Sequence, residues 1–406
     1  MKEYLLKNNL KIVYKKSESE LTSICISLDA GAGREEKKFG IAHATEHMIY
    51  KSTKKRNESQ INKELNEIFG FQNAMTNYPY VIYYGTLLNE DFERGIELFA
   101  DILINPVFPH KGFKEEMDVI KQELEEWDEE SDQYCEDKLF LNSFDERRIK
   151  YPIIGIKEHL EKIQREDIIK FYDEYYFPEN TTITIVSNMN FEDIIKILDK
   201  YFGIWQEKYG SRNNIVKTVF YEKPKIEQFS NKKEGIKNCR GQLVVPIDKL
   251  TAREMKLLRL FNEHFGEGVN SILYDILRTK KGLVYDVQTH INDESYIKMY
   301  KIIFSAAKEN ADYIIELIKK SIDNLDKYNL KDEYKVKELY KSIKLKKLFK
   351  EEKGIIAAKE LGTYEAMFGS YKIYENQFVF DESITFEEVV LFGKKLLQNL
   401  SVELIE

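Results

Sequence analysis

The sequence predicts an α+β protein of two similar domains, each a mainly antiparallel sheet packed with helices. Two observations carry this prediction. Strand-like segments, then helical ones, then strands, then helices follow one another in residues 1–202, and the same order returns after residue 240. The chain of 406 residues is also long for a single core, so two domains of about 200 residues each are expected.

The first half divides by hydrophobic periodicity and by its glycines and prolines. Its alternating or continuous apolar segments predict strands, the first two of them paired with each other, at residues 3–15, 21–30, 71–76, 80–88 and 181–187. Its helical segments begin near Ile41, after a glycine-containing loop, and lie at residues 58–69, over most of 91–176 and at 190–202. Pro106 and Pro109 separate the first helix of the long stretch from the next.

We place a linker directly after Phe202, because GIWQEKYGSRNN holds two glycines, few apolar residues and no clear period. The expected domains are therefore residues 1–210 and 211–406. In the second half, strands are predicted at residues 240–246, 284–291 and 297–306. Helices are predicted at residues 251–265 and 269–280 and over most of 309–369.

Composition excludes several classes of function. The 62 basic and 70 acidic residues leave a net charge of −8, and no basic block stands out, so no nucleic-acid partner is expected. Three scattered cysteines without a CxxC pair favour a reducing compartment. The first twenty residues lack the apolar core of a signal peptide, and no window has the roughly 18 uncharged apolar residues of a membrane span. We expect a cytoplasmic protein without a membrane partner.

The segment GIAHATEHMIY carries the pattern His-x-x-Glu-His. On a helix, His43 and His47 are four residues apart and lie on one face, so both imidazoles can reach one ion, and Glu46 lies close to that face. Two imidazoles and a carboxylate form a zinc site that leaves a fourth position open for water. The competing interpretation is that ordinary core or surface residues fall into the pattern by chance, which six histidines make about a one-in-a-hundred event.

A third ligand is expected downstream, in the acidic helix around FKEEMDVIKQELEEWDEE. Glu116 and Glu123 are seven residues apart and share one helix face, and Glu126 and Glu130 lie close to that stripe. Most acids of such a helix simply face solvent. Helical spacing alone leaves the choice open between Glu123, Glu126 and Glu130.

These residues resemble the pitrilysin/insulinase family of inverted-motif zinc metallopeptidases, in the short two-domain form related to mitochondrial processing peptidase. In that family a glutamate ligand follows the motif by about 76 residues, and Glu123, within Val-Ile-Lys-Gln-Glu-Leu, holds the matching position. Glu116 matches an acidic position that supports the metal site. The resemblance therefore implies a zinc ion held by His43, His47 and Glu123.

The likeness extends over nearly the whole chain. Asn73, Ala74 and Thr76 match the family's Asn-Ala-x-Thr strand, which lines the substrate groove, so the resemblance implies that they bind substrate. In the second half, FGEGVNSILYDILRTKKGLVYDV is similar to the segment with a paired arginine and tyrosine, here Arg278 and Tyr285. The sequence departs from the common family pattern at four positions: Gly33, Ser52, Gln122 and Glu267.

The resemblance implies a zinc endopeptidase that hydrolyses small or unfolded peptides inside a clam-shell chamber, of which one chain forms half. Glu46 would be the general base, Arg278 would hold the substrate backbone and Tyr285 would donate to the oxyanion. A chamber of two chains implies a homodimer, or a heterodimer with a related subunit. The alternative is an inactive family member that serves as a scaffold or peptide-binding subunit, which metal analysis would distinguish.

Overall fold

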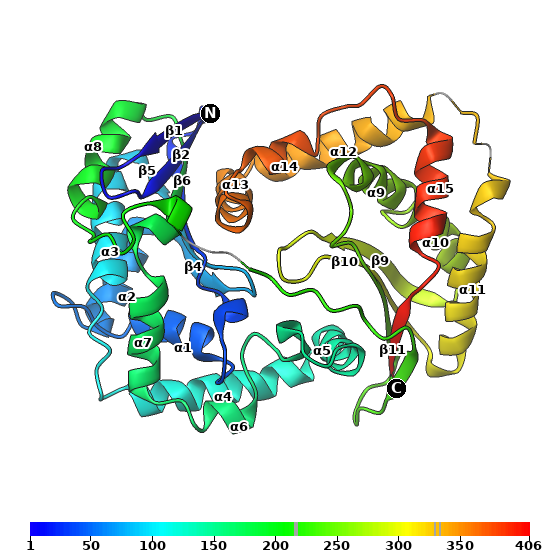
Figure 1. Ribbon diagram of the computed structural model, residues 1–406, viewed down its shortest axis with the longest axis horizontal. Coiled ribbons are helices and arrows are strands. Elements are labelled where there is room, and N and C mark those ends of the chain that lie inside the picture. Colours follow the sequence, from blue (N-terminus) through cyan, green and yellow to red (C-terminus); the bar gives the residue numbers. More distant parts are fainter. Residues whose placement is uncertain (215–217, 329, 333) are drawn as a thin grey trace. The chain divides into compact units, whose positions relative to one another are not determined.

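The structure is a computed structural model that describes residues 1–214, 218–328, 330–332 and 334–406. The chain forms two compact units, each built from three segments, and each is described by itself (Figure 1). The first unit comprises Met1–Glu125, Pro152–Val219 and Phe349–Tyr374. The second comprises Glu126–Tyr151, Phe220–Leu348 and Glu375–Glu406.

The first unit is built on a six-stranded sheet of order β1-β2-β6-β3-β5-β4. Its strands are β1 (Lys2–Leu5), β2 (Lys11–Lys16), β3 (Leu21–Leu28), β4 (Phe69–Thr76), β5 (Val81–Leu88) and β6 (Thr181–Ser187). The pairing of β2 with β6 is parallel and the other pairings are antiparallel. The central strand β6 is buried along its whole length, as its continuous apolar and β-branched sequence TTITIVS predicts. Strand β4 forms one edge of this sheet.

The predicted pairing of residues 3–15 with 21–30 is wrong. Residues 3–15 contain two strands that fold back on each other, with Asn9 in the turn at a φ of 62°. The amide of Asn8 fixes this turn by donating to the carbonyls of Phe202 and Trp205, at 2.8 and 3.0 Å. Strand β6 then lies between β2 and β3. Apolar alternation indicates that a segment is a strand, but it carries no information about which strand becomes its neighbour.

The helices of the first unit cover the predicted helical segments. They are α1 (Ile41–Ile49), α2 (Glu58–Ile68), α3 (Phe92–Ile104), most of α4 (Phe113–Glu129), α6 (Lys157–Leu160), α7 (Arg165–Tyr175), α8 (Phe191–Phe202) and α13 (Gly354–Phe368). Helix α2 begins at a capping box in which the Asn57 side chain accepts from Gln60 N and the Gln60 side chain accepts from Asn57 N. Helix α3 ends just before Pro106, which cannot continue a helical hydrogen-bond ladder.

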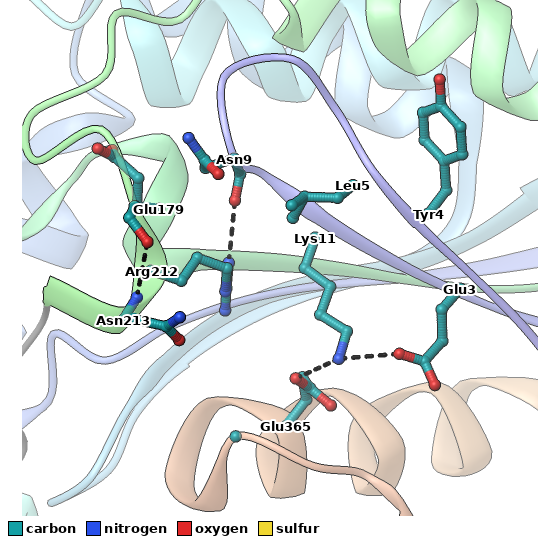
Figure 2. Close-up of a pocket in the computed structure, with 11 residues that line it drawn as sticks. Glu3, Tyr4, Leu5, Asn9, Lys11, Glu179, Arg212, Asn213 and Glu365 are labelled. Carbon is teal, nitrogen blue, oxygen red and sulfur yellow. Dashed lines mark hydrogen bonds and ion pairs between the residues drawn. The ribbon is translucent and has the colours of Figure 1, made fainter.

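Helix α13 comes from far along the chain and packs on β3 and β6 of the first sheet. Two lysines on one face of β2 hold the segment. Lys11 pairs with the buried Glu365 at 2.7 Å and with Glu3 at 3.0 Å (Figure 2), and Lys15 pairs with Glu351 at 2.8 Å. The pairs of Lys11 with Glu365 and of Lys15 with Glu351 join strand β2 to the segment that carries α13.

The second unit repeats the strand plan of the first. Its strands are β7 (Gln228–Asn231), β8 (Cys239–Pro246), β9 (Val284–Asn292), β10 (Met299–Ala306) and β11 (Ser401–Ile405). Their order, β7-β11-β8-β10-β9, matches β2-β6-β3-β5-β4 strand for strand in chain order, and here too the first pair is parallel and the rest antiparallel. The predicted α+β class and the similar plan of the two halves are confirmed.

The remaining helices are α5 (Ser131–Ser143), α9 (Ala252–Phe265), α10 (Ile272–Tyr274), α11 (Ala311–Asp323), α12 (Lys335–Glu351), α14 (Lys372–Asn376) and α15 (Phe386–Leu396). The predicted helix at 269–280 is instead α10 followed by a π-helical turn at Asp275–Thr279. Helix α15 and strand β11 lie in a segment for which the sequence analysis predicted no element. The apolar side of α9 packs against α15 within the core of this unit.

The units do not coincide with two continuous stretches of chain. Residues 1–210 and 211–406 were predicted as the domains, but α5 packs on β8 and β11 of the second sheet, and α13 packs on the first sheet. Each unit therefore takes one helical segment from the other half of the sequence. Local periodicity shows that these segments are helices without indicating the sheet they cover.

Candidate metal centre

The helix with the histidine pattern is anchored at its N-terminus by the loop before it. Gly40 is the N-cap residue at a φ of 101°, where a side chain would meet the carbonyl oxygen of Ile154. The buried carboxylate of Glu35 accepts from the backbone N–H groups of Gly40 and Ala42, at 3.0 and 2.8 Å. A carboxylate there satisfies donors that the first helical turn leaves free and complements the helix dipole. The loop thus fixes where α1 begins, and with it the positions of the histidines.

Two histidines of α1 and one glutamate of α4 converge on a single point of the first unit. The Nε2 atoms of His43 and His47 are 3.2 Å apart. Oε2 of Glu123 lies 3.5 Å from His47 Nε2 and 3.9 Å from His43 Nε2. Among the described residues, these three form the one group of His, Cys, Asp and Glu side chains whose ligand atoms could hold a metal ion.

The geometry fits a zinc ion. Ligand atoms bound to a tetrahedral Zn²⁺ at roughly 2.0–2.2 Å lie about 3.3–3.5 Å from one another. Two of the three separations, 3.2 and 3.5 Å, are close to that value, and the third, at 3.9 Å, needs a small movement of a half-exposed glutamate side chain. The donors are two imidazole nitrogens and one carboxylate oxygen, a set that binds zinc with one position left open.

The electrostatics of the two imidazoles differ. Burial, helped by the neighbouring charge of His47, lowers the pKa of His43 to about 3. Burial also lowers the pKa of His47, but its hydrogen bond to Glu116 and the charges of Glu123 and Glu46 outweigh burial and raise that pKa above its usual value. His43 is therefore neutral at pH 7, as a metal ligand must be, and His47 sits in a negative environment that attracts a cation.

Glu116 lies behind His47, on the side away from the converging atoms. Its Oε1 is 2.7 Å from His47 Nδ1, so the imidazole is held with Nε2 turned toward Glu123. Lys51 contacts the other carboxylate oxygen of Glu116 and also Glu58. Burial alone would raise the pKa of Glu116, yet the hydrogen bonds to His47 and Lys51 outweigh it and lower that pKa. Glu116 is thus an anion that orients the imidazole.

Lys51 was not predicted as a site residue. It follows His47 by four residues and lies just past the end of α1 at Ile49, and this spacing was available from the sequence. The signal was missed because a lysine is never expected as a zinc ligand. Its role is to neutralise the second oxygen of Glu116.

Glu46 faces the edge strand of the sheet. Its buried carboxylate accepts a hydrogen bond of 2.5 Å from the hydroxyl of Thr76, the last residue of β4. Burial raises the pKa of Glu46, and the hydrogen bond from Thr76 offsets that rise only in part. A carboxylate with a raised pKa holds a proton more readily, which is the property that a general base near neutral pH requires.

The three predicted substrate-binding residues lie along β4 in different settings. Asn73 is exposed, and its side-chain oxygen accepts from the backbone N–H of Ala74 at 2.9 Å. Thr76 is buried, and its hydroxyl is turned to Glu46. A contact of Thr76 with a peptide would therefore involve its backbone.

Arg278 and Tyr285 come together in the second unit. Arg278 lies in the π-helical turn, and its guanidinium donates to the backbone carbonyl of Tyr285 at the start of β9. The same guanidinium lies 5.4 Å from the ring centroid of Tyr274. The side chain of Tyr285 is exposed, so its hydroxyl is accessible to a ligand.

Comparison with known proteins places this chain among the peptidases. Residues 11–157 match the domain described as "Insulinase (Peptidase family M16)", and residues 162–337 match the one described as "Peptidase M16 inactive domain". The two matches together span most of the sequence. The chain belongs to the insulinase family of peptidases, family M16.

The relatives carry protease names. An "uncharacterized zinc protease" of Rickettsia felis is 24% identical over 408 residues, which cover 98% of this chain and 96% of that protein. The "uncharacterized zinc protease YmxG" of Bacillus subtilis is 24% identical over 80% of this chain and 78% of its own length. A probable mitochondrial-processing peptidase subunit beta of Schizosaccharomyces pombe is 28% identical, over 49% of this chain and 44% of that protein.

Solved structures share the fold. A protease from Helicobacter pylori superposes with a TM-score of 0.88 at 19% identity and covers 100% of this chain and 99% of its own. A protein from Pseudomonas fluorescens, described as a peptidase M16 inactive domain, gives a TM-score of 0.86 at 14% identity, with coverage of 100% and 97%. None of the described helices is long and apolar enough to cross a membrane.

Proposed function

We propose that the protein is a zinc-dependent endopeptidase, with zinc held by His43, His47 and Glu123 and with Glu46 as general base. The observation that carries the proposal is the convergence of Nε2 of both histidines and Oε2 of Glu123 within 3.2 to 3.9 Å. The names of the relatives support a zinc protease. The intact set of ligands and base in this chain supports catalysis rather than a purely structural role.

When bound, zinc would polarise the scissile carbonyl and make a water molecule acidic. The protein's own side chains would transfer the proton and hold the reacting groups in position. Glu46, next to the ligand His47 in sequence, would take the proton of the attacking water and pass it to the leaving amine. Thr76 holds one oxygen of Glu46 in place, and Glu116 holds the His47 ring. The base and the His47 ring are thus held in place before substrate arrives, which lowers the entropic cost of reaching the transition state.

The substrate would lie as an added strand along the free edge of β4. Ala74 N–H is covered by the Asn73 side chain, and a peptide carbonyl would replace that oxygen when Asn73 swings away. Main-chain pairing of this kind selects extended, unfolded peptides rather than a particular sequence. The proposed role of Asn73 and Ala74 is therefore to bind the peptide backbone.

We place Arg278 and Tyr285 in the substrate-binding role that the family resemblance implies. Tyr285 would donate its hydroxyl to the oxyanion, and Arg278 would hold the substrate backbone. The first unit would then be the zinc-binding catalytic domain and the second the domain that carries this pair. An enclosed chamber would need two chains, so a homodimer, or a heterodimer with a related subunit, is part of the proposal, as is a cytoplasmic location.

A second function deserves a test because residues 162–337 match a domain described as inactive. In that case the chain would be a scaffold or peptide-binding subunit of a heterodimer. The match lies outside both α1 and α4, which supply the base and the proposed zinc ligands. It therefore does not bear on the metal centre itself.

The test is the variant Glu46→Gln, compared with wild type for zinc content and for cleavage of an unstructured fluorogenic peptide. We expect one zinc per chain in both proteins and loss of cleavage in the variant, since glutamine cannot accept the proton. The control is Glu36→Gln, an exposed glutamate of the preceding loop, which should cleave like wild type. Full cleavage by Glu46→Gln would overturn the base assignment, and wild type with zinc but without cleavage would favour the scaffold function.

A further inference from the structure

A cavity lies on the first unit, on the face of the sheet that α13 covers only in part. It has a volume of about 1210 Å³, above the roughly 300–1,000 Å³ of common ligand sites. Its floor consists of side chains from strands β2 to β6, among them Leu21, Ser23, Tyr84 and Thr86. The first turn of α13 forms one wall, and the last residues of α2 together with the first of β4 form the opposite one. His43, His47 and Glu123 do not line this cavity.

Large apolar side chains stand open around the cavity. Leu21, Phe71 and Leu88 are exposed by 46%, 50% and 46%, although all three belong to strands of a packed sheet. Apolar groups gathered at a hollow, rather than scattered singly, indicate a binding surface. The group that binds here must therefore be largely apolar.

One positively charged side chain that lines the cavity, Lys359, has no carboxylate in the described part of the chain as an ion-pair partner. The ammonium of Lys359 lies 4.3 Å from the ring centroid of Tyr84, and among the described residues no acid pairs with it. Four acids line the cavity. Three are engaged elsewhere, Glu351 with Lys15, Asp91 with Arg94 and Glu67 with Lys63, and the fourth, Glu352, is exposed and forms no ion pair with Lys359. A half-buried, unpaired ammonium over an aromatic ring favours a ligand that brings a negative charge.

The position of the cavity relative to β4 identifies its occupant. Phe71 lies on β4 five residues before Thr76, whose hydroxyl contacts Glu46. At about 3.3 Å per residue, the two positions are separated by roughly 17 Å along the open edge of the sheet. Side chains alternate along β4, so Phe71 points to the same face as Met75, which packs against the cluster under α13. A peptide strand along β4 would run from the catalytic end straight to the cavity.

We propose that this cavity is a distal subsite for the same peptide substrate. It takes a bulky apolar side chain about five residues from the cleaved bond, with a neighbouring carboxylate on Lys359. This inference rests on the proposed endopeptidase function and adds a substrate class to it: peptides long enough to span both sites, with an apolar and acidic segment at the far one. Short peptides would reach the metal centre alone.

The test compares a short fluorogenic peptide, with three residues on either side of the cleaved bond, with long ones that extend seven residues on both sides. In the long series, a Phe-Glu pair is moved through the outer positions of an otherwise Ala- and Ser-rich sequence. For wild type we expect Phe-Glu at one outer position to raise kcat/KM at least about tenfold over Ala-Ala, since burying a phenylalanine is worth that much. Leu21→Asp should abolish the gain and leave the short peptide unaffected.

The matched control is Leu391→Asp, because Leu391 is a leucine of α15 with the same exposure of 46%, outside the cavity. It should keep the preference for Phe-Glu. Binding of the labelled long peptide to the Glu46→Gln variant, measured by fluorescence anisotropy, separates the two proposals. If Leu21→Asp weakens peptide binding but wild type does not cleave the peptide, the peptidase function is contradicted and the subsite is supported. Cleavage with equal kcat/KM for Phe-Glu and Ala-Ala at every outer position would overturn the subsite alone.

Discussion

The hydroxyl of Thr76 donates to Oε2 of Glu46 at 2.5 Å, and both residues are buried. This hydrogen bond joins the helix of the metal centre to the edge strand on which a peptide would lie. It places the proposed base at the end of the proposed peptide groove, within one unit of the chain. In the proposed function, the contact would therefore link substrate binding to proton transfer.

Removal of this hydroxyl should slow catalysis without loss of metal. We expect Thr76→Val, which keeps the shape of the side chain, to lower kcat by about 10- to 100-fold, because a hydrogen bond to a charged group is lost. Thr76→Ser should restore most of the rate. Zinc content and KM for a short peptide should change little, and a Thr76→Val enzyme with the kcat of wild type would show that Glu46 needs no such support.

Glu116 should control metal affinity. Loss of its charge in Glu116→Gln frees the His47 ring and leaves Lys51 without one of its partners, so zinc should bind roughly 10- to 100-fold more weakly. Competition with a chromogenic chelator measures the change. Glu125→Gln removes the same charge from an exposed position of the same helix and should bind zinc like wild type. Equal affinities of the two variants would contradict the orienting role of Glu116.

Asp137 on α5 should make stability depend on pH. Burial raises its pKa to about 7, although Trp127 and Gln133 donate hydrogen bonds to it. The unfolded chain releases this proton near pH 4, so between about pH 4 and 7 the folded state holds more protons than the unfolded one. The free energy of unfolding should therefore fall as pH rises through that window, by a few kcal/mol in all.

Urea unfolding at pH 5 and pH 8, followed by tryptophan fluorescence, checks this sign. Asp137→Asn should be more stable than wild type at pH 8, and the difference should be smaller at pH 5. Glu309→Gln, an exposed carboxylate of the same unit, should show no such difference. If wild type gains stability from pH 5 to pH 8 relative to Asp137→Asn, the carboxyl is ionised in the folded state.

The ion pair of Lys11 with Glu365 should stabilise the attachment of α13. Lys11→Met would leave the buried Glu365 without its cation, at a cost of about 3 kcal/mol, whereas Lys196→Met, which breaks an exposed pair with Asp193, should cost under about 1 kcal/mol. Unfolding midpoints in urea measure both. The double variant Lys11→Met/Glu365→Leu should recover part of the loss, and a double variant no better than Lys11→Met would argue against an uncompensated charge as the cause.

Sequence reasoning reached the local elements and the metal motif because both depend on short spacings. The four-residue spacing of His43 and His47 and the apolar pattern of β6 can be recognised from the sequence without knowledge of the fold. Long-range choices were not accessible in this way: β6 inserts between β2 and β3, and α13 crosses to the first sheet, through contacts between residues more than a hundred positions apart. Helical spacing also left three acids as candidates for the third ligand. Only the family resemblance favoured Glu123, which the structure brings to the histidines.

Zinc content, measured by plasma mass spectrometry on dialysed protein, tests the central claim most directly. Wild type should hold one zinc per chain, while Glu123→Ala and His43→Ala should each hold less than a tenth of that and remain folded by circular dichroism. Wild type without zinc, or a Glu123→Ala variant with as much zinc as wild type, would contradict a metal centre formed by these three side chains.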